Sequence, residues 1–403
     1  MNKHNSVPNI RFNGFEDKWK KSELKEIAKI VGGGTPDTNN ANYWNGNINW
    51  YSPNEIGKYP YVYSSHKKIT NLGFKKSSAK LHPSEKTILF TSRAGIGDMA
   101  ILKTEAATNQ GFQSLELKNN INPYFVYSYG FKIKREAYKL ASGSTFLEIS
   151  KKDMEKINLW LPTKNEQQKI GDFFTKLDKL LDLQQKKIDK LELLKKALLQ
   201  KLFPRHDTKI PELRFKGFER DWNQDKAINI FKNVSDKNHP ELPVLSASQE
   251  DGMVLRKDIN IDIKFKNSSL TTYKKVEPGQ FVIHLRSFQG GFAYSTFEGI
   301  TSPAYTILAF IKKENHYKLF WKQIFLSGNF IRRLKTITYG VRDGKSISYN
   351  DFGSLNICFP FIKEQQKIGN LLSKVDQLIE LENKKLQNFQ QLKKCLLQNL
   401  FVE

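Results

Sequence analysis

Hydrophobic residues recur every seven positions in two long stretches of the chain, residues 166–203 and 364–401. In the first stretch, one line of positions is Ile170, Leu177, Gln184, Leu191 and Leu198, a second is Phe173, Leu180, Lys187, Leu194 and Lys201, and Phe174, Leu181, Ile188 and Leu202 widen the stripe. In the second stretch, the two lines are Ile368, Val375, Glu382, Phe389 and Leu396, and Leu371, Leu378, Lys385, Leu392 and Asn399. This pattern predicts coiled-coil helices, each a rod of about 55 Å at about 1.5 Å per residue. The alternative is a helix buried in a bundle.

Polar residues interrupt the heptads at the same place in both stretches. Gln184 and Lys187 lie near the middle of the first stretch, and Glu382 and Lys385 lie near the middle of the second. If the helices pair antiparallel, these four residues share one layer, with Lys187 and Glu382 as the candidate ion pair. Such a layer weakens a coiled coil but specifies its register. Alternatively, Lys187 and Lys385 point outward into solvent.

Both stretches belong to an internal repeat of about 200 residues. Residues 8–19, PNIRFNGFEDKW, share seven of twelve positions with residues 211–222, PELRFKGFERDW. Residues 162–203 share 21 of 42 positions with residues 360–401, at an offset of 198. The regions between, 31–140 and 234–338, show no similarity that can be aligned by eye. We therefore expect a duplicated module with a constant scaffold and divergent middles.

The divergent middles combine turn-rich segments with short β-prone runs. Residues 32–40, GGGTPDTNN, form a turn cluster, and residues 87–90 and 280–283 have the composition of strands. The predicted fold class is α+β: two mixed α/β globules separated by two long helices that pack as an antiparallel coiled coil, with a pseudo-two-fold repeat. The predicted boundaries are 1–161 and 204–359 for the globules, and 162–203 and 360–403 for the helices.

Length and composition bound the class of protein. A chain of 403 residues suits two or three domains, and 39% hydrophobic residues suffice for packed cores. The sequence has no run of about 18 apolar residues for a membrane span, and no signal-peptide pattern at its N-terminus. Only Cys358 and Cys395 are present, which excludes a disulfide scaffold and a cysteine-built zinc site. We expect a cytoplasmic protein.

The chain carries 65 Lys and Arg against 41 Asp and Glu, a formal charge of +24, which favours an anionic polymer as partner. The two helical stretches hold little of this charge, so most of it lies in the globular regions, among aromatic and amide residues that can read base edges. The candidate DNA-binding residues are Tyr43, Trp44, Asn47, Lys67, Lys68, Ser92, Arg93, Asn109 and Gln110 in the first region, and Ser246, Ser248, Gln249, Lys264, Lys266, Arg286, Gln289, Tyr339 and Arg342 in the second. Lys274 and Lys275 adjoin the second set. Taken singly, each residue is better explained as a solvated surface position; it is their concentration in two globules, each joined to a long helix, that favours DNA binding.

Apparent catalytic motifs fail on spacing. Residues 340–346, GVRDGKS, are one residue short of a phosphate-binding P-loop between their glycines, and glycines 32–34 do not complete a dinucleotide fingerprint. The Asn/Asp-Pro-Pro-aromatic tetrapeptide of amino-group methyltransferases does not occur, and the seven His residues have no metal-binding spacing. His284 is expected to be structural or to face DNA. We therefore predict no catalytic residue and no metal site.

Several short strings occur in a distinctive order. They are Gly33-Gly34-Thr35-Pro36, Tyr43-Trp44-Asn45-Gly46-Asn47-Ile48, Ser92-Arg93-Ala94-Gly95-Ile96-Gly97, Thr108-Asn109-Gln110-Gly111-Phe112, Gly143-Ser144-Thr145-Phe146-Leu147 and both copies of Glu-Gln-Gln-Lys-Ile-Gly. This order, together with the half-chain repeat, resembles the specificity subunit of type I restriction–modification systems over essentially the whole chain.

The resemblance implies a non-catalytic targeting subunit that binds double-stranded DNA and reads a bipartite, asymmetric site, one half with each recognition domain. The two helices would act as a spacer of about one helical turn, roughly 34–36 Å, between the domains. They would also dock two methyltransferase subunits, which bind S-adenosylmethionine and methylate adenine. A motor-nuclease restriction subunit, which uses ATP and Mg, would join to cut unmodified DNA. The chain itself would bind no cofactor and no membrane.

Two other classes of protein fit part of the pattern. One is a coiled-coil adaptor whose basic charge is incidental, and the other is an RNA-binding module. A DNA reader should lose duplex affinity steeply as salt rises, whereas an adaptor should show no duplex affinity.

Overall fold

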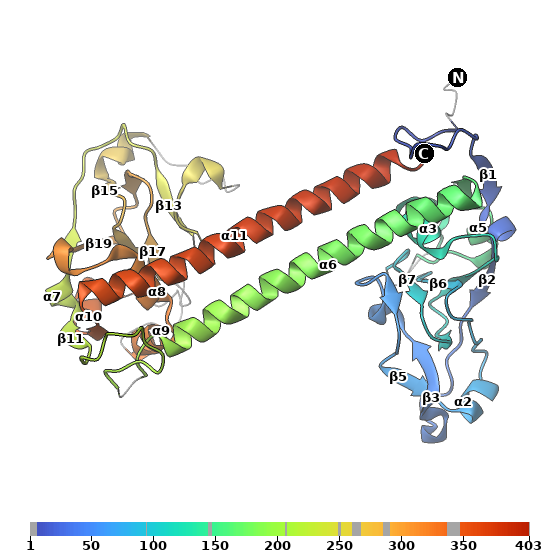
Figure 1. Cartoon of the computed structure of the whole chain (residues 1–403), viewed down its shortest axis with the longest axis horizontal. Coiled ribbons are helices and arrows are strands. Elements are labelled where there is room, and N and C mark those ends of the chain that lie inside the picture. Colours follow the sequence, from blue (N-terminus) through green and yellow to red (C-terminus); the bar gives the residue numbers. More distant parts are fainter. Residues whose placement is uncertain are drawn as a thin grey trace. The chain divides into compact units, whose positions relative to one another are not determined.

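The computed structural model describes residues 6–93, 95–143, 147–205, 208–248, 251–259, 267–284, 291–336 and 347–402. The chain divides into two compact units: unit 1 contains residues 1–185 and 385–403, and unit 2 contains residues 186–384. Each unit consists of one globular region and the adjoining halves of two long helices, α6 (Lys164–Lys201) and α11 (Ile362–Asn399) (Figure 1). The predicted α+β class is therefore confirmed.

Unit 1 is built on a five-stranded sheet of order β2-β9-β6-β7-β4 and a three-stranded sheet of order β5-β3-β8. Its strands are β1 (Lys20–Glu23), β2 (Ala28–Gly32), β3 (Trp44–Tyr51), β4 (Tyr61–Val62), β5 (Lys67–Ile69), β6 (Thr87–Phe90), β7 (Met99–Leu102), β8 (Ala106–Thr108), β9 (Gln113–Leu117) and β10 (Asn158–Leu161). Its short helices are α1 (Leu24–Ile27), α2 (Asn71–Lys75), α3 (Pro123–Ser128), α4 (Gly130–Leu140) and α5 (Lys151–Glu155). β1 pairs antiparallel with β10, so the domain begins and ends beside the start of α6.

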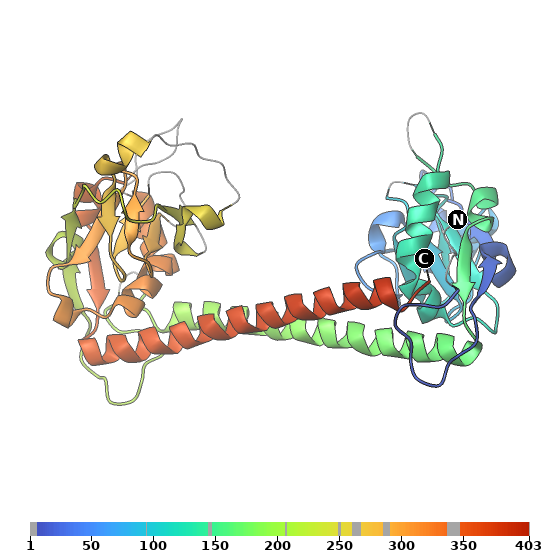
Figure 2. The same ribbon diagram turned by 90° about the horizontal axis from the view of Figure 1, so that it is seen from above.

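The core of unit 1 joins its sheets to both long helices. Strands β6 and β7 are buried along their whole length, in keeping with their sequences TILF and MAIL, in which Thr87 is the single polar residue. Trp19 from the opening box is 2% exposed and contacts Phe125 of α3 and Phe401 after α11. Figure 2 shows the C-terminal end of α11 reaching this globular region. The repeated box is therefore part of the joint between domain and helices.

Unit 2 repeats this strand order with different sequences. Its four-stranded sheet has the order β12-β19-β16-β17, and three two-stranded sheets are β11-β20, β13-β14 and β15-β18. Its strands are β11 (Asn223–Lys226), β12 (Phe231–Val234), β13 (Leu245–Ser248), β14 (Gly252–Leu255), β15 (Lys274–Val276), β16 (Phe281–Ile283), β17 (Phe292–Tyr294), β18 (Gly299–Thr301), β19 (Thr306–Phe310) and β20 (Asn356–Phe359). Its short helices are α7 (Ala227–Ile230), α8 (Lys318–Leu326), α9 (Gly328–Thr336) and α10 (Tyr349–Gly353). Trp222 of the second box is 2% exposed and lies against Phe203 and Phe320.

The long helices run antiparallel within each unit, as predicted. In unit 2 the α6 residues Lys187 and Lys195 pair with Glu382 and Asp376 of α11, so the partner number falls as the α6 number rises. In unit 1 the α6 residue Asp178 pairs with Lys393 of α11. The coiled-coil expectation is therefore correct in direction.

One predicted apolar line is wrong. Leu180 and Leu194 of α6 are 42% and 48% exposed, and Leu378 and Leu392 of α11 are 45% and 49% exposed. The buried positions lie one residue later, at Phe174 and Ile188 in α6, at Leu202 directly after α6, and at Leu372 and Leu386 in α11. Phe174 belongs to the core of unit 1 and Leu372 to the core of unit 2, so near each domain the buried face of the helix is turned toward that core.

Candidate nucleic-acid interface

Unit 1 brings four predicted DNA-contacting or neighbouring residues together at one end of its sheets. We call Thr35, Arg93, Asn109 and Gln110 the polar edge. Gly34 N donates to Thr108 O over 2.8 Å, and Thr35 Oγ1 donates to Gln110 Oε1. A Cβ on Gly33 would lie 2.0 Å from Asn109 O, so only glycine allows the two segments to approach this closely.

Arg93 joins this edge through the next segment of the chain. Ser92 N donates to Gly111 O over 2.8 Å, and Arg93 forms a β-bridge with Glu148. Arg93 is half-buried, whereas Ser92 is fully buried, with Oγ 3.5 Å from Glu148 Oε1. Ser92 therefore supports the edge from inside, and Arg93, Asn109 and Gln110 are the side chains with access to a ligand.

A buried histidine lies beneath the polar edge. His82 is 0% exposed, with Nδ1 3.0 Å from Glu116 Oε1 and Nε2 3.4 Å from Thr108 Oγ1. Burial lowers the pKa of His82, and its hydrogen bond to the Glu116 carboxylate opposes that shift only partly. The histidine thus holds Thr108, the residue before Asn109, and has no access to solvent.

The other candidates of unit 1 gather on β3, on Tyr43 directly before it, and on β5. Lys67 Nζ lies 5.7 Å from the centre of the Trp44 ring, which meets Trp50 edge-to-face at 5.1 Å. Trp44 Nε1 donates to Asp37 O, and Trp50 Nε1 donates to Gly34 O, so segment 33–37 links this group to the polar edge. Tyr43 and Lys68 are half-buried, and Asn47 is exposed. A lysine beside the half-buried Trp44 ring suits a surface that contacts a nucleic acid.

The candidates of unit 2 are described less completely. Ser246 and Ser248 lie on β13, where Arg256 Nε donates to Ser246 Oγ over 3.0 Å and Ser248 Oγ donates to Asp251 Oδ2 over 3.1 Å. Gln249, Lys264, Lys266, Arg286, Gln289, Tyr339 and Arg342 lie outside the described residues. Their role in DNA binding stays a prediction.

The repeated Glu-Gln-Gln-Lys-Ile-Gly string forms a joint that sequence reasoning missed. In unit 1 Arg11 of the opening box binds both carboxylate oxygens of Glu166, at 2.8 and 2.7 Å, and donates to Asp17 O. In unit 2 Arg214 binds Glu364 in the same way, at 2.8 and 2.9 Å. The buried carboxylate raises the pKa of each arginine, chiefly through these hydrogen bonds. The identical Arg and Glu positions in both repeats were the available clue.

The next residue of the string ties each helix to its domain. Gln167 Nε2 donates to Pro162 O, and Gln167 Oε1 accepts from Asn122 N, directly before α3. In unit 2 Gln365 Nε2 donates to Pro360 O, and Gln365 Oε1 accepts from Tyr317 N, directly before α8. The glycine that ends the string allows this approach, since a Cβ on Gly171 would lie 2.5 Å from Asn122 Oδ1.

A second pair of contacts joins domain and both helices at equivalent positions. In unit 1 Asp178 accepts from Tyr124 Oη over 2.6 Å and pairs with Lys393. Burial, followed by the bond to Asp178, raises the pKa of Tyr124. In unit 2 Asp376 accepts from Gln323 Nε2 over 2.9 Å and pairs with Lys195 over 2.6 Å. Each aspartate therefore connects its own long helix both to the globular region and to the other long helix of the unit.

Of the four polar residues that interrupt the heptads, two are buried and two are exposed. Gln184 and Glu382 are each 6% exposed, whereas Lys187 and Lys385 are exposed. Lys187 Nζ lies 2.6 Å from Glu382 Oε1, so the predicted partners are together. Lys385 does not share a buried layer, because its Nζ lies outside over the Phe389 ring at 5.9 Å. That this pair sets the register stays a prediction.

Each unit exposes three leucines on its long helices, at positions that are equivalent in the repeat. They are Leu180, Leu183 and Leu392 in unit 1, at 42%, 55% and 49% exposure, and Leu378, Leu381 and Leu194 in unit 2, at 45%, 61% and 48%. Leu180 and Leu183 lie three residues apart and so on one side of α6. Exposed apolar sets of this kind mark surfaces that contact other proteins.

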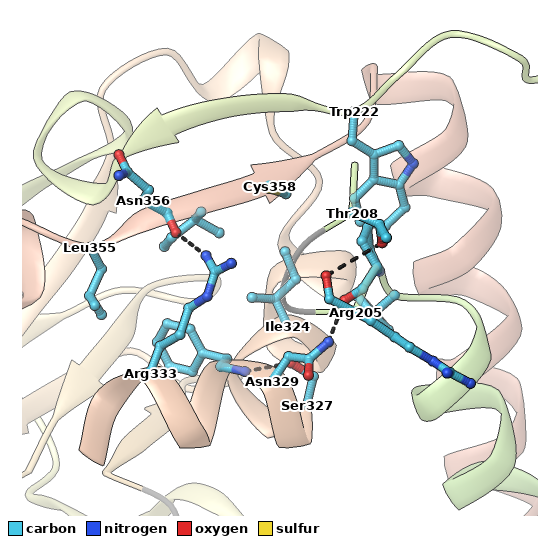
Figure 3. Close-up of a pocket in the computed structure, with 14 residues that line it drawn as sticks. Arg205, Thr208, Trp222, Ile324, Ser327, Asn329, Arg333, Leu355, Asn356 and Cys358 are labelled. Atoms are coloured by element: carbon cyan, nitrogen blue, oxygen red, sulfur yellow. Dashed lines mark hydrogen bonds between the residues drawn. The ribbon is translucent and has the colours of Figure 1, made fainter. Parts of the chain in front are cut away.

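A small cavity of about 50 Å³ in unit 2 lies where the end of α6, the second box and α9 meet (Figure 3). Arg333 NH1 donates to Asn356 O over 2.5 Å, and Asn329 Nδ2 donates to Pro204 O. In unit 1 Tyr129 Oη and Lys132 Nζ donate to the equivalent carbonyl, Val402 O. The cavity is too small for more than a water molecule or two and belongs to the packing of this joint.

Among the described residues, no helix is long and apolar enough to cross a membrane. No group of three or more His, Cys, Asp or Glu residues among them is arranged to hold a metal ion.

Comparison with known proteins places these features in a family. A family model described as the type I restriction modification DNA specificity domain matches residues 16–193 and 225–391. The chain is 31% identical over 233 residues to the type I restriction enzyme MjaIX specificity subunit of Methanocaldococcus jannaschii, covering 55% of this chain and 54% of that protein. It is 34% identical over 180 residues to the EcoR124I/EcoR124II specificity subunit of Escherichia coli, covering 42% of this chain and 43% of that protein. The chain thus spans about half the length of the curated relatives it matches first.

The fold also has a solved counterpart. The crystal structure of a type I restriction-modification system S subunit from M. genitalium superposes with a TM-score of 0.61 at 17% sequence identity, covering 98% of this chain and 99% of that chain. At this identity the similarity concerns the fold, and it agrees with the two-domain, two-helix arrangement described above.

Proposed function

Because the chain belongs to the type I restriction modification DNA specificity domain family, we propose that it reads a bipartite, asymmetric DNA site and targets partner subunits to it. Each globular region reads one half of the site. A symmetric dimer of identical readers recognises a palindrome, whereas two unlike readers on one repeated scaffold recognise an asymmetric sequence. The bases between the two half-sites stay unread.

One observation carries this proposal: the scaffold contacts are repeated while the sheet edges are not. The Arg11–Glu166 pair of unit 1 and the Arg214–Glu364 pair of unit 2 occupy equivalent positions. The same holds for the contacts of Asp178 and Asp376. In contrast, the sequence around Thr35, Asn109 and Gln110 of the polar edge is not repeated in the second half of the chain. Recognition domains that can be exchanged on one scaffold need constant contacts to the helices and a variable DNA-contacting edge.

We propose that methyltransferase partners dock on the exposed leucine sets. The two sets are equivalent under the repeat, so two identical subunits bind in equivalent ways. These partners supply methyl transfer with S-adenosylmethionine, and a restriction partner supplies cleavage with ATP and Mg. This chain contributes no catalytic residue and binds no cofactor.

Domain exchange tests the reading function. Residues 31–140 are replaced by the corresponding region of another family member, and the cells' methylomes are sequenced before and after. One half of the methylated site should change and the other half should stay. A change in both halves would contradict the two-reader proposal. If the chain binds no duplex at any salt concentration, the adaptor alternative is correct instead.

The docking surface is tested by counting partners in native mass spectrometry. Leu180→Lys with Leu183→Lys should reduce two bound methyltransferase subunits to one, as should Leu378→Lys with Leu381→Lys, and the four substitutions together should leave none. Lys176→Ala, on an exposed position of α6, is the control and should retain two. Two bound subunits in the fourfold variant would place the docking surface elsewhere.

A further inference from the structure

We propose that the second half-site is contacted at an edge of unit 2 formed by Lys237, Lys274, His284 and Tyr305, where Lys237 and Lys274 bind a backbone phosphate of duplex DNA. This inference rests on the proposed function and assigns residues to it. Of these four residues, sequence patterns pointed to Lys274 and, as structural or DNA-facing, to His284, and most of the second candidate set lies outside the described residues.

The location follows from the topology that both units share. The polar edge of unit 1 consists of the segments that follow β2, β6 and β8. Because the order β12-β19-β16 repeats β2-β9-β6, the counterparts of the first two segments follow β12 and β16. The parallel bridge between Val244 and Ile300 matches the parallel pairing of β3 with β8, so the third counterpart follows β18. These three segments contain Lys237, His284 and Tyr305.

The described contacts bring the four residues together from separate parts of the chain. Lys237 forms an antiparallel β-bridge with Lys274. Lys274 Nζ donates to Tyr305 O over 2.7 Å, and the rings of His284 and Tyr305 lie 6.2 Å apart. Lys274 therefore links the segment after β12 to the segment after β18. The edge thus runs from Lys237 through Lys274 to Tyr305 and His284.

The charges at this edge suit a phosphate. The Lys274 ammonium has three N–H donors, and the described contacts supply one acceptor, the Tyr305 carbonyl. Burial, followed by the nearby positive charge of Lys237, lowers the pKa of Lys274. Its neighbour Lys275 differs, because Glu298 lies 2.8 Å away and raises the pKa of Lys275. A phosphate oxygen between Lys237 and Lys274 would supply acceptors and relieve their mutual repulsion.

The test compares Lys274 with Lys275 in the full-length chain assembled with its methyltransferase partner. The probe is a duplex that carries the methylated site found by methylome sequencing, with a scrambled duplex as reference. Binding is measured at several salt concentrations. Each lost phosphate contact should lower the slope of log affinity against log salt by about 0.9. We expect Lys274→Met and Lys237→Met each to lower the slope by about one and the affinity about tenfold.

Lys275→Met is the matched control, because that lysine already has a carboxylate partner. It should leave affinity within about twofold of the unsubstituted chain, in line with the modest effect of an exposed ion pair. If Lys274→Met and Lys237→Met behave like Lys275→Met, the inference is overturned while the proposed function stands. If the unsubstituted complex binds both duplexes equally and without salt dependence, the proposed function itself fails.

A second measurement addresses the bases. Tyr305→Ala should relax sequence preference in the half-site assigned to the second domain, and leave the other half unchanged in the methylome. Thermal unfolding of each variant shows that the domain is still folded. Unchanged preference at both half-sites with a folded Tyr305→Ala chain would remove Tyr305 from the contact surface.

Discussion

The buried arginine–glutamate pair of unit 1 gives the sharpest stability prediction. The perturbation is a double-mutant cycle with Arg11→Met, Glu166→Met and both together. Methionine retains much of the volume and unbranched shape of each side chain while removing its charge. The equivalent pair in unit 2, Arg214 and Glu364, allows the same cycle to be repeated in a second setting.

The expected magnitudes follow from burial. Glu166 is 0% exposed and receives two hydrogen bonds from Arg11, so Arg11→Met leaves a buried carboxylate without them and should cost about 3–5 kcal/mol. Glu166→Met should cost about 2–3 kcal/mol, because the Arg11 side chain is 13% exposed and still donates to Asp17 O. The double variant should cost only about 1–2 kcal/mol, since an apolar pair replaces a buried ion pair. The coupling is then about 3 kcal/mol or more.

Two assays measure the cycle. Guanidinium unfolding gives the free energies, and hydrogen exchange read by mass spectrometry locates the change. Arg11→Met should accelerate exchange in the first turns of α6, residues 164–171, and leave residues 362–369 of α11 unchanged. Lys164→Met, at an exposed position of the same first turn, is the control and should alter neither.

The double variant decides the outcome. If its loss in free energy of unfolding equals the sum of the losses in the two single variants, the two side chains do not interact. The joint is then held by other contacts. Faster exchange in both helix starts after Arg11→Met would mean that the pair acts on the whole chain and not on its own unit.

Three further predictions concern other parts of the scaffold. Residues 1–205 alone should form a symmetric dimer in sedimentation equilibrium, because residues 187–203 repeat the sequence of 385–401 that completes unit 1; a stable monomer would contradict this. Gly171→Ala should destabilise the chain by about 1–3 kcal/mol in chemical unfolding although alanine favours helices, because its Cβ would meet Asn122, and Lys176→Ala should show no such loss. Burial lowers the pKa of His316 to about 4, so below pH 6.5 the folded chain binds fewer protons than the unfolded chain. The free energy of unfolding should therefore fall as the pH drops from about 6.5 toward 4. The expected loss is about 1 kcal/mol, because the side chain is partly accessible to solvent. His316→Phe should remove that part of the pH dependence and leave the part due to His82, and an unchanged pH profile would show that His316 contributes none.

Much of the organisation could be predicted from the sequence because it depends on local or repeated patterns. Heptad spacing reports helix geometry directly, and the predicted helices at 162–203 and 360–403 contain the observed Lys164–Lys201 and Ile362–Asn399. The repeat predicted two domains on one scaffold. The partners Lys187 and Glu382 followed from the antiparallel register, since both lie near the middle of their helices.

The candidate site was predictable only in part. Arg93, Asn109 and Gln110 were found because their residue types suit base edges, and the structure does bring them to one edge. Ser92 has a suitable hydroxyl, but its full burial depends on how residues 91–93 cross beneath Gly111. In unit 2 the residues gathered around Lys274 come from three separate loops, and no local pattern relates them.

Only the tertiary structure decided which side of each helix is buried. Periodicity places Leu180 and Phe174 on neighbouring lines of one apolar stripe. Packing against the core of unit 1 buries Phe174 and leaves Leu180 exposed. Likewise, Arg11 and Glu166 are 155 positions apart, and their charges are ordinary surface charges until the opening box folds over the start of α6. Sequence by itself determined the helices, the repeat and the charge of this protein, because these arise from neighbouring residues. The joint, the buried face and the binding edges arise from contacts between distant residues, whose free energy depends on the packing of the whole unit.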